Sequence, residues 1–211
     1  MLLKDNKGQD FDPVPAGMHH AICYGVVDIG TQESPNSKFG PKRKVILLFE
    51  LPYERIEIKD RGNLPRGVST KQTASLSEKA NLRKMLVSWR GREFTKEELE
   101  GFDTKKLLGV NCQLNIIHET KGDKTYANIT SIVPLGKGMQ RRDPENETLH
   151  FSIDDENFDP ANPTFPKNMP NWIQGLILNS VEVQSAAGPH EPKPASAPED
   201  AKGPDEDDIP F

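Results

Sequence analysis

One amphipathic helix interrupts a stretch that otherwise alternates like β-strands, and this order limits the folds open to the chain. The apolar stripe of the helix consists of Leu82, Met85, Leu86 and Trp89. These positions recur at helical spacing, so they predict one face packed against a sheet. Ser75 and Glu78 have the spacing of a capping box before the helix, and Gly91 is placed to end it. A second capping box at Thr95 and Glu98 predicts a short helical turn.

Five strand-like runs flank this helix. They cover residues 18–30, 45–49 with an extension to 58, 67–73, 111–119 and 125–133. The last two are joined by a short Gly-Asp turn, which is typical of a β-hairpin. Three strands, a helix and a hairpin are the element order of the OB-fold, a five-stranded barrel. The predicted fold class is therefore all-β, with one or two helices.

Composition divides the chain into four segments. Residues 1–17 form a polar lead-in, residues 18–135 the barrel, residues 136–183 an acidic extension and residues 184–211 a Pro/Ala-rich tail that we expect to be disordered. Within the extension, Asn171 is placed to cap a short helix. The apolar residues of that helix are Trp172, Ile173, Leu176 and Ile177. They need an apolar surface, so we expect the helix to pack on the barrel or on a second subunit.

Charge is distributed unevenly along the chain. Residues 1–142 carry 24 Lys and Arg against 17 Asp and Glu, whereas residues 143–190 carry 1 against 8 and residues 191–211 carry 2 against 7. A basic body is thus followed by acidic segments. This polarity is typical of a domain that binds a polyanion and of a tail that can mimic the polyanion.

The last seven residues have a composition that suits protein docking. They are Asp205, Glu206, Asp207, Asp208, Ile209, Pro210 and Phe211. Such a segment buries too little apolar surface to fold alone. A partner with an apolar pocket for Phe211 and basic groups for the carboxylates would recognise it. The alternative is a solvated, solubilising tail, which does not need an apolar Ile-Pro-Phe.

This acidic tip resembles that of single-stranded DNA-binding proteins from bacteria and their phages. The segments Thr73–Lys79, Ser88–Arg92 and Leu108–Leu114 extend the resemblance to residues 15–135. It implies an OB-fold that coats single-stranded DNA. It also implies a tip that recruits replication, recombination and repair proteins and competes with DNA for the basic groove.

An OB-fold binds single strands through cations for phosphates and exposed aromatic rings for bases, over strands two and three and the flanking loops. The first basic group is Lys38, Lys42, Arg43 and Lys44. A second group is Arg55, Lys59, Arg61, Arg66 and Lys71, and the last hairpin adds Lys121 and Lys124. The candidate stacking residues are Tyr126, Phe39 and Tyr53. Phe49 and Trp89 fall on apolar stripes and are predicted to be core.

The sequence favours a binding protein over an enzyme. It has no nucleophile with a placed base, no Walker or dinucleotide loop and no metal-ligand spacing, so we predict no catalytic residue, cofactor or metal. Cys23 and Cys112 are expected to be buried apolar residues. The sequence shows no signal peptide or membrane-spanning run, so we expect a cytoplasmic protein of a bacterium or its phage.

A different class of function fits the same tip. In that alternative the chain is an adaptor that docks on a host replication enzyme through residues 205–211, and its β-domain binds protein instead of DNA. Binding of a labelled oligonucleotide separates the two hypotheses. The oligomeric state and the number of nucleotides per protomer stay open, since OB-folds bind about 4 to 16 nucleotides.

Overall fold

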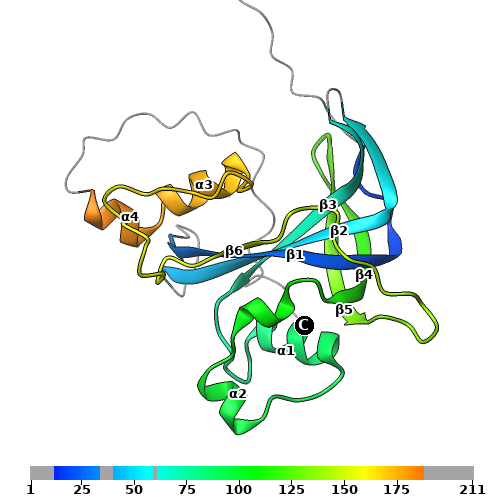
Figure 1. The fold of residues 1–211 in the computed structure, drawn as a ribbon, viewed down its shortest axis with the longest axis horizontal. Coiled ribbons are helices and arrows are strands. Elements are labelled where there is room, and N and C mark those ends of the chain that lie inside the picture. Colours follow the sequence, from blue (N-terminus) through cyan, green and yellow to red (C-terminus); the bar gives the residue numbers. More distant parts are fainter. Residues whose placement is uncertain (1–11, 34–39, 59–60, 188–211) are drawn as a thin grey trace, which may run out of the picture.

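The computed structural model describes residues 12–33, 40–58 and 61–187. These residues form a mostly β, OB-like fold, which confirms the predicted class (Figure 1). The barrel strands are β1 (Gly17–Gln32), β2 (Lys42–Ile58), β3 (Gly62–Thr73), β4 (Asn111–Lys121) and β5 (Lys124–Pro134). They are hydrogen-bonded in the order β3-β2-β1-β4-β5. Between β3 and β4 lie α1 (Asn81–Arg90), α2 (Lys96–Glu100) and the 3-10 helix η1 (Thr104–Leu107).

Strand β1 changes partners along its length, which curves the sheet. Its first part, Gly17–Ile22, pairs with β4, while its remainder pairs with β2 and contains a bulge at Tyr24. Where β4 leaves this edge, β6 (Leu149–Phe151) pairs with Gly25–Val27 in parallel. Covering an edge in this way removes a row of unpaired backbone groups.

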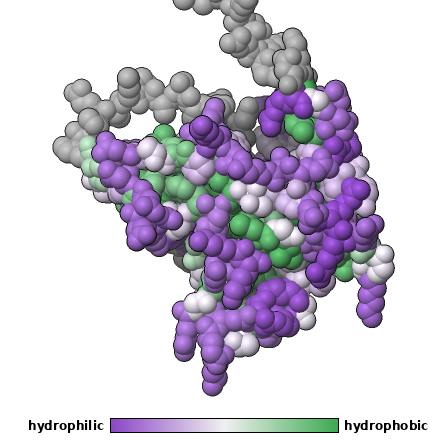
Figure 2. All heavy atoms as spheres, in the orientation of Figure 1, coloured by the Kyte–Doolittle hydropathy of each residue, from purple (hydrophilic) through white to green (hydrophobic). Residues whose placement is uncertain are grey.

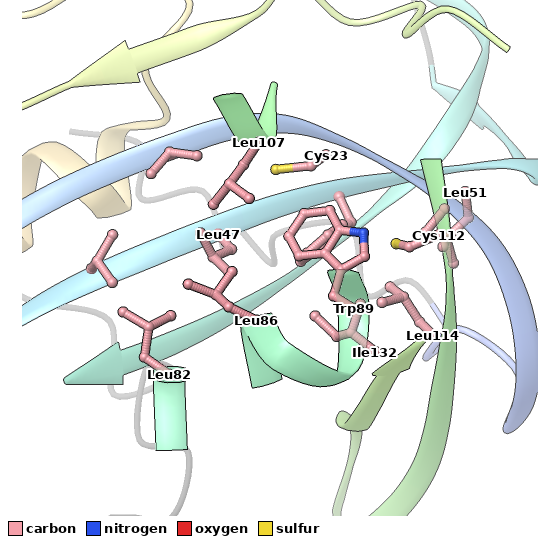
Figure 3. Close-up of a cluster of buried hydrophobic side chains, with 14 of the residues drawn as sticks. Cys23, Leu47, Leu51, Leu82, Leu86, Trp89, Leu107, Cys112, Leu114 and Ile132 are labelled. Atoms are coloured by element: carbon pink, nitrogen blue, oxygen red, sulfur yellow. The ribbon is translucent and has the colours of Figure 1, made fainter. Parts of the chain in front are cut away.

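The barrel interior is filled by the inward residues of the strands and by one face of α1. Phe49 and Trp89 are buried, with ring centroids 5.5 Å apart, as their apolar stripes predicted. Figure 3 shows the Trp89 indole among Leu86, Leu114 and Ile132. Cys23 and Cys112 are also buried, and desolvation raises the pKa of the Cys23 thiol to about 12. Both thiols therefore behave as apolar core groups.

A second apolar layer covers the outer face of β1 and β2. It is built by residues after β6, including α3 (Asn171–Leu178) and α4 (Val181–Ala186). Ile173 and Ile177 pack with Ile29 and Leu48 of the barrel, and each of the four is at most 3% exposed. Figure 1 shows α3 and α4 on the opposite side of β1 from α1. The extension therefore packs on the barrel, one of the two surfaces considered for it.

Several element boundaries differ from the sequence predictions. The capping box at Ser75 and Glu78 was wrong, because α1 starts at Asn81 with Ala80 as its N-cap. Asn171 was likewise wrong as a cap, since Pro170 holds that position in α3. Strand β3 begins at Gly62, earlier than predicted, and α4 continues past residue 183.

Other local predictions were right. The capping box at Thr95 and Glu98 is formed in both directions. Gly91 ends α1 in a left-handed conformation, with φ of 68°. Arg90 and Arg92 close this corner by pairing with Glu98, whose pKa the arginines and the Thr95 amide lower to about 2. Within the described ranges, no helix is long and apolar enough to cross a bilayer.

Candidate nucleic-acid interface

The predicted contact residues lie on three parts of the barrel. The start of β2 carries Lys42, Arg43 and Lys44. The end of β2 and the start of β3, here called the β2–β3 arm, carry Tyr53, Arg55, Arg61 and Arg66, and Lys71 follows on β3. Lys121, Lys124 and Tyr126 flank the β4–β5 turn. In Figure 1 the β2–β3 arm rises away from α1 and α2. Lys38, Phe39, Lys59 and the tip, residues 205–211, lie outside the described residues.

Tyr53 is the most exposed aromatic ring among the described residues, at 61%. It sits where the β2–β3 register shifts between Leu51 and Arg55, and such bulges turn side chains away from the regular alternation. The Arg142 guanidinium carbon lies 5.1 Å from the centre of the Tyr53 ring. The buried His20 ring lies 5.6 Å from it on a tilted plane. The Tyr53 ring is therefore exposed to solvent and contacts the side chains of Arg142 and His20.

Asn111 of β4 holds the backbone of Arg142, whose guanidinium lies over this ring. Its Oδ1 accepts from the Arg142 backbone N at 2.9 Å, and its Nδ2 donates to the Arg142 carbonyl at 2.8 Å. The same Oδ1 is hydrogen-bonded to His20 Nε2 at 2.7 Å. The sequence analysis placed Arg142 in the acidic extension and did not count it among the contact residues. The only signal was the Arg141-Arg142 pair, which says nothing about Tyr53.

Glu50 holds the chain just beyond Arg142. Its side chain is fully buried and accepts hydrogen bonds from the backbone N of Glu145 and of Asn146, each at 2.8 Å. The Asn146 amide donates a third, at 2.7 Å. Desolvation and the Glu50 charge raise the pKa of the neighbouring Tyr24. Residues 142–146 are thereby attached to the barrel at both ends.

Arg43 is already engaged by two carboxylates. Its Nε donates to Asp28 Oδ1 at 3.1 Å, and its NH2 donates to Asp28 and, at 2.7 Å, to Asp154 Oδ2. Hydrogen bonding to Asp28 is the largest cause that raises the pKa of Arg43. Next to it, Lys44 Nζ donates to Thr73 Oγ1 at 3.0 Å. Arg43 and Lys44 of the first basic group therefore lie within a polar network.

The β2–β3 arm holds its cations in different ways. Arg55 donates to Asn63 Oδ1 at 2.6 Å and to the Asn63 carbonyl at 2.8 Å, and its NH1 donates to Glu145 Oε1 at 2.6 Å. Arg66 donates to the Pro13 carbonyl at 3.1 Å and is half-buried. Arg61 and Lys71 are exposed.

The outer face of the β4–β5 hairpin carries polar side chains around Tyr126, with Ile117 exposed among them. Tyr126 pairs across the strands with Glu119 and is half-buried. Glu119 Oε2 accepts from Asn128 at 2.7 Å, and Glu119 Oε1 lies 3.5 Å from Lys121 Nζ. Tyr126 thus stands among polar neighbours as its alternation predicted, but it is less exposed than Tyr53. Strands β3 and β5 contact each other where the barrel closes.

A cavity of about 360 Å³ opens between α1, η1 and β6. Its walls include Leu82, Phe102 and Phe151, and Figure 2 shows apolar surface in this part of the molecule. Asp28 and Asp103 also line it. Arg43 lines it too and pairs with Asp28, so this part of the wall carries charges of both signs.

Among the described residues, no three His, Cys, Asp or Glu side chains are grouped to hold a metal ion. No protein-family model matches the chain, and no curated protein matches its sequence.

Proposed function

We propose that this protein binds single-stranded DNA without sequence preference, through the side of the barrel that carries the β2–β3 arm. The observation that carries the proposal is the exposed Tyr53 ring with Arg142 held beside it. Every base has a flat π-face, so an exposed tyrosine accepts any base. A guanidinium next to the ring adds a cation for the neighbouring phosphate.

Further cations lie along the same side. Arg55 is exposed two residues after Tyr53 on β2, and Arg61 lies at the far end of the arm. Arg141 is exposed next to Arg142. Phosphate contacts of this kind supply affinity without reading sequence. The preference for DNA over RNA and the recruitment of replication, recombination or repair proteins come from the resemblance of residues 205–211, and both belong to the proposal.

Fluorescence polarisation of a labelled oligo-dT tests the proposal. We expect binding that weakens steeply with salt, because bound cations displace counterions from the strand. Tyr53→Ala should weaken it by about 5- to 150-fold, since one stacked base contributes about 1–3 kcal/mol. Trp172→Ala is the matched control, because Trp172 is also exposed, at 44%, but lies on α3.

Two results would count against the proposal. Equal losses for both variants would show that Tyr53 is not a stacking site. No binding by the wild-type protein at low salt would exclude DNA binding and favour the adaptor, in which the tip docks on a replication enzyme and the β-domain binds protein.

A further inference from the structure

Two arginines of the barrel share one arrangement. Each guanidinium is oriented by a partner on the barrel itself, and each also pairs with a carboxylate from the segment after β5. For Arg43 the partners are Asp28 and Asp154, and for Arg55 they are Asn63 and Glu145. The same arrangement thus occurs at two separate positions of the barrel.

The two partners of Arg43 differ in exposure. The Asp28 side chain is 14% exposed, and it also accepts from Ser152 Oγ at 3.2 Å and from the Gly30 backbone at 3.1 Å. The Asp154 side chain is 70% exposed. Asp28 is therefore a fixed part of the site. Asp154, in contrast, is a solvent-exposed carboxylate that accepts one hydrogen bond from Arg43 NH2.

Arg55 repeats the pattern. Asn63, its cross-arm neighbour on β3, holds two of its nitrogens, and the Glu145 side chain that holds the third is 45% exposed. The backbone of Glu145 is fixed separately by Glu50, at 2.8 Å. The Glu145 carboxylate can therefore leave Arg55 without moving the chain that carries it.

We propose that Asp154 and Glu145 occupy the positions of two phosphates of bound DNA, and that the strand displaces these carboxylates when it binds. This inference rests on the proposed function and adds that the protein's own carboxylates compete with DNA for two of its arginines. Carboxylate and phosphate oxygens accept the same N–H donors of a guanidinium. Exposed ion pairs are weak, and a polyanion that replaces them gains the release of its own counterions. Asp28 and Asn63 keep the two guanidiniums oriented when the exposed carboxylates leave.

The test removes the charge of each carboxylate and keeps its shape. Asp154→Asn and Glu145→Gln are compared with Glu156→Gln and Glu147→Gln, which remove the same charge from exposed positions of the same segment. We expect each of the first two to tighten oligo-dT binding about two- to fivefold at low salt, the range of an exposed ion pair. The double variant should gain more, and the gain should fade as salt rises. The two controls should change affinity little.

A double-mutant cycle adds specificity. In an Arg55→Gln background, Glu145→Gln should no longer tighten binding, because the pair that it breaks is absent. If all four single variants shift affinity equally, the effect is general charge and the inference is wrong while DNA binding stands. If neither the wild-type protein nor the double variant binds DNA, the proposed function fails and this inference fails with it.

Discussion

Gly30 shows how one residue fixes the position of a distant helix. Its φ of +72° lies in the left-handed region, and a Cβ there would meet the Ser180 Cβ at 2.7 Å. Ser180 is the N-cap of α4, and its Oγ accepts from Val183 N. Beside it, Glu182 accepts from the Thr31 N and Oγ1 at 2.8 and 2.7 Å. The end of β1 and the start of α4 are therefore joined where no side chain fits.

We predict that Gly30→Ala destabilises the protein by about 2–4 kcal/mol, from left-handed strain together with overpacking. Gly122→Ala is the control, because Gly122 also has positive φ, +58°, but a Cβ added there would meet no atom within 4 Å. It should cost only about 1 kcal/mol. Urea denaturation of both variants measures the difference. Equal costs would mean that α4 yields to the added methyl group.

Individual core residues were predictable from the sequence, but the polar anchors were not. Phe49 and Trp89 fall on apolar stripes, and periodicity alone assigns such residues to an interior. Glu50 lies on the outward face of β2 and is nevertheless fully buried, because Asn146 covers it from 96 residues away. Asn111 is similar. Periodicity tells which face a side chain occupies, but it does not tell which distant segment lies on that face.

At the scale of elements, the segment after residue 135 is part of the folded body. The sequence analysis placed a segment boundary there, on composition. In the structure, β6 pairs with β1 beyond it, and α3 and α4 cover Ile29 and Leu48. The order of the five barrel strands was predictable because each is a patterned run. The three residues of β6 carry too short a pattern, and their pairing depends on the edge that β4 leaves open.

We predict that this outer layer unfolds together with the barrel. Ile177→Ala should destabilise the whole protein by about 2–5 kcal/mol, because Ile177 is fully buried between α3 and the sheet. Leu178→Ala, at a position 40% exposed, should change stability by about 0.5 kcal/mol or less. Urea denaturation followed by circular dichroism and by Trp89 fluorescence, in a Trp172→Phe background, gives the values.

Coincident transitions by the two probes would show one cooperative unit. If Ile177→Ala instead unfolds helix at low urea while Trp89 fluorescence stays native, the layer is an independent appendage. Truncation after residue 135 would then leave a stable barrel. The cooperative prediction implies the opposite, since truncation would expose the apolar outer face of β1 and β2.

At the scale of the whole molecule, a basic body is followed by two acidic segments. Residues 1–142 carry an excess of seven positive charges and residues 143–190 an excess of seven negative ones. Part of that acidic segment lies against the barrel and pairs with Arg43 and Arg55. Residues 191–211 add five further net negative charges. If the body binds DNA, both acidic parts oppose it, and they should do so additively.

The two proposed roles of residues 205–211 can be separated by their chemistry. Neutralising the four acids, with Asp205→Asn, Glu206→Gln, Asp207→Asn and Asp208→Asn, should tighten oligo-dT binding at low salt, because competition for the cations is electrostatic. Phe211→Ala keeps those charges, so it should leave DNA affinity unchanged while it abolishes binding to a host replication enzyme, measured by titration with that enzyme. Buried aromatic anchors dominate such peptide contacts, whereas flanking charges mainly affect association rates. Deletion of all seven residues should show both effects. If deletion leaves DNA affinity unchanged at low salt, the tip does not compete with DNA, and the self-inhibition of this protein resides in Asp154 and Glu145 alone.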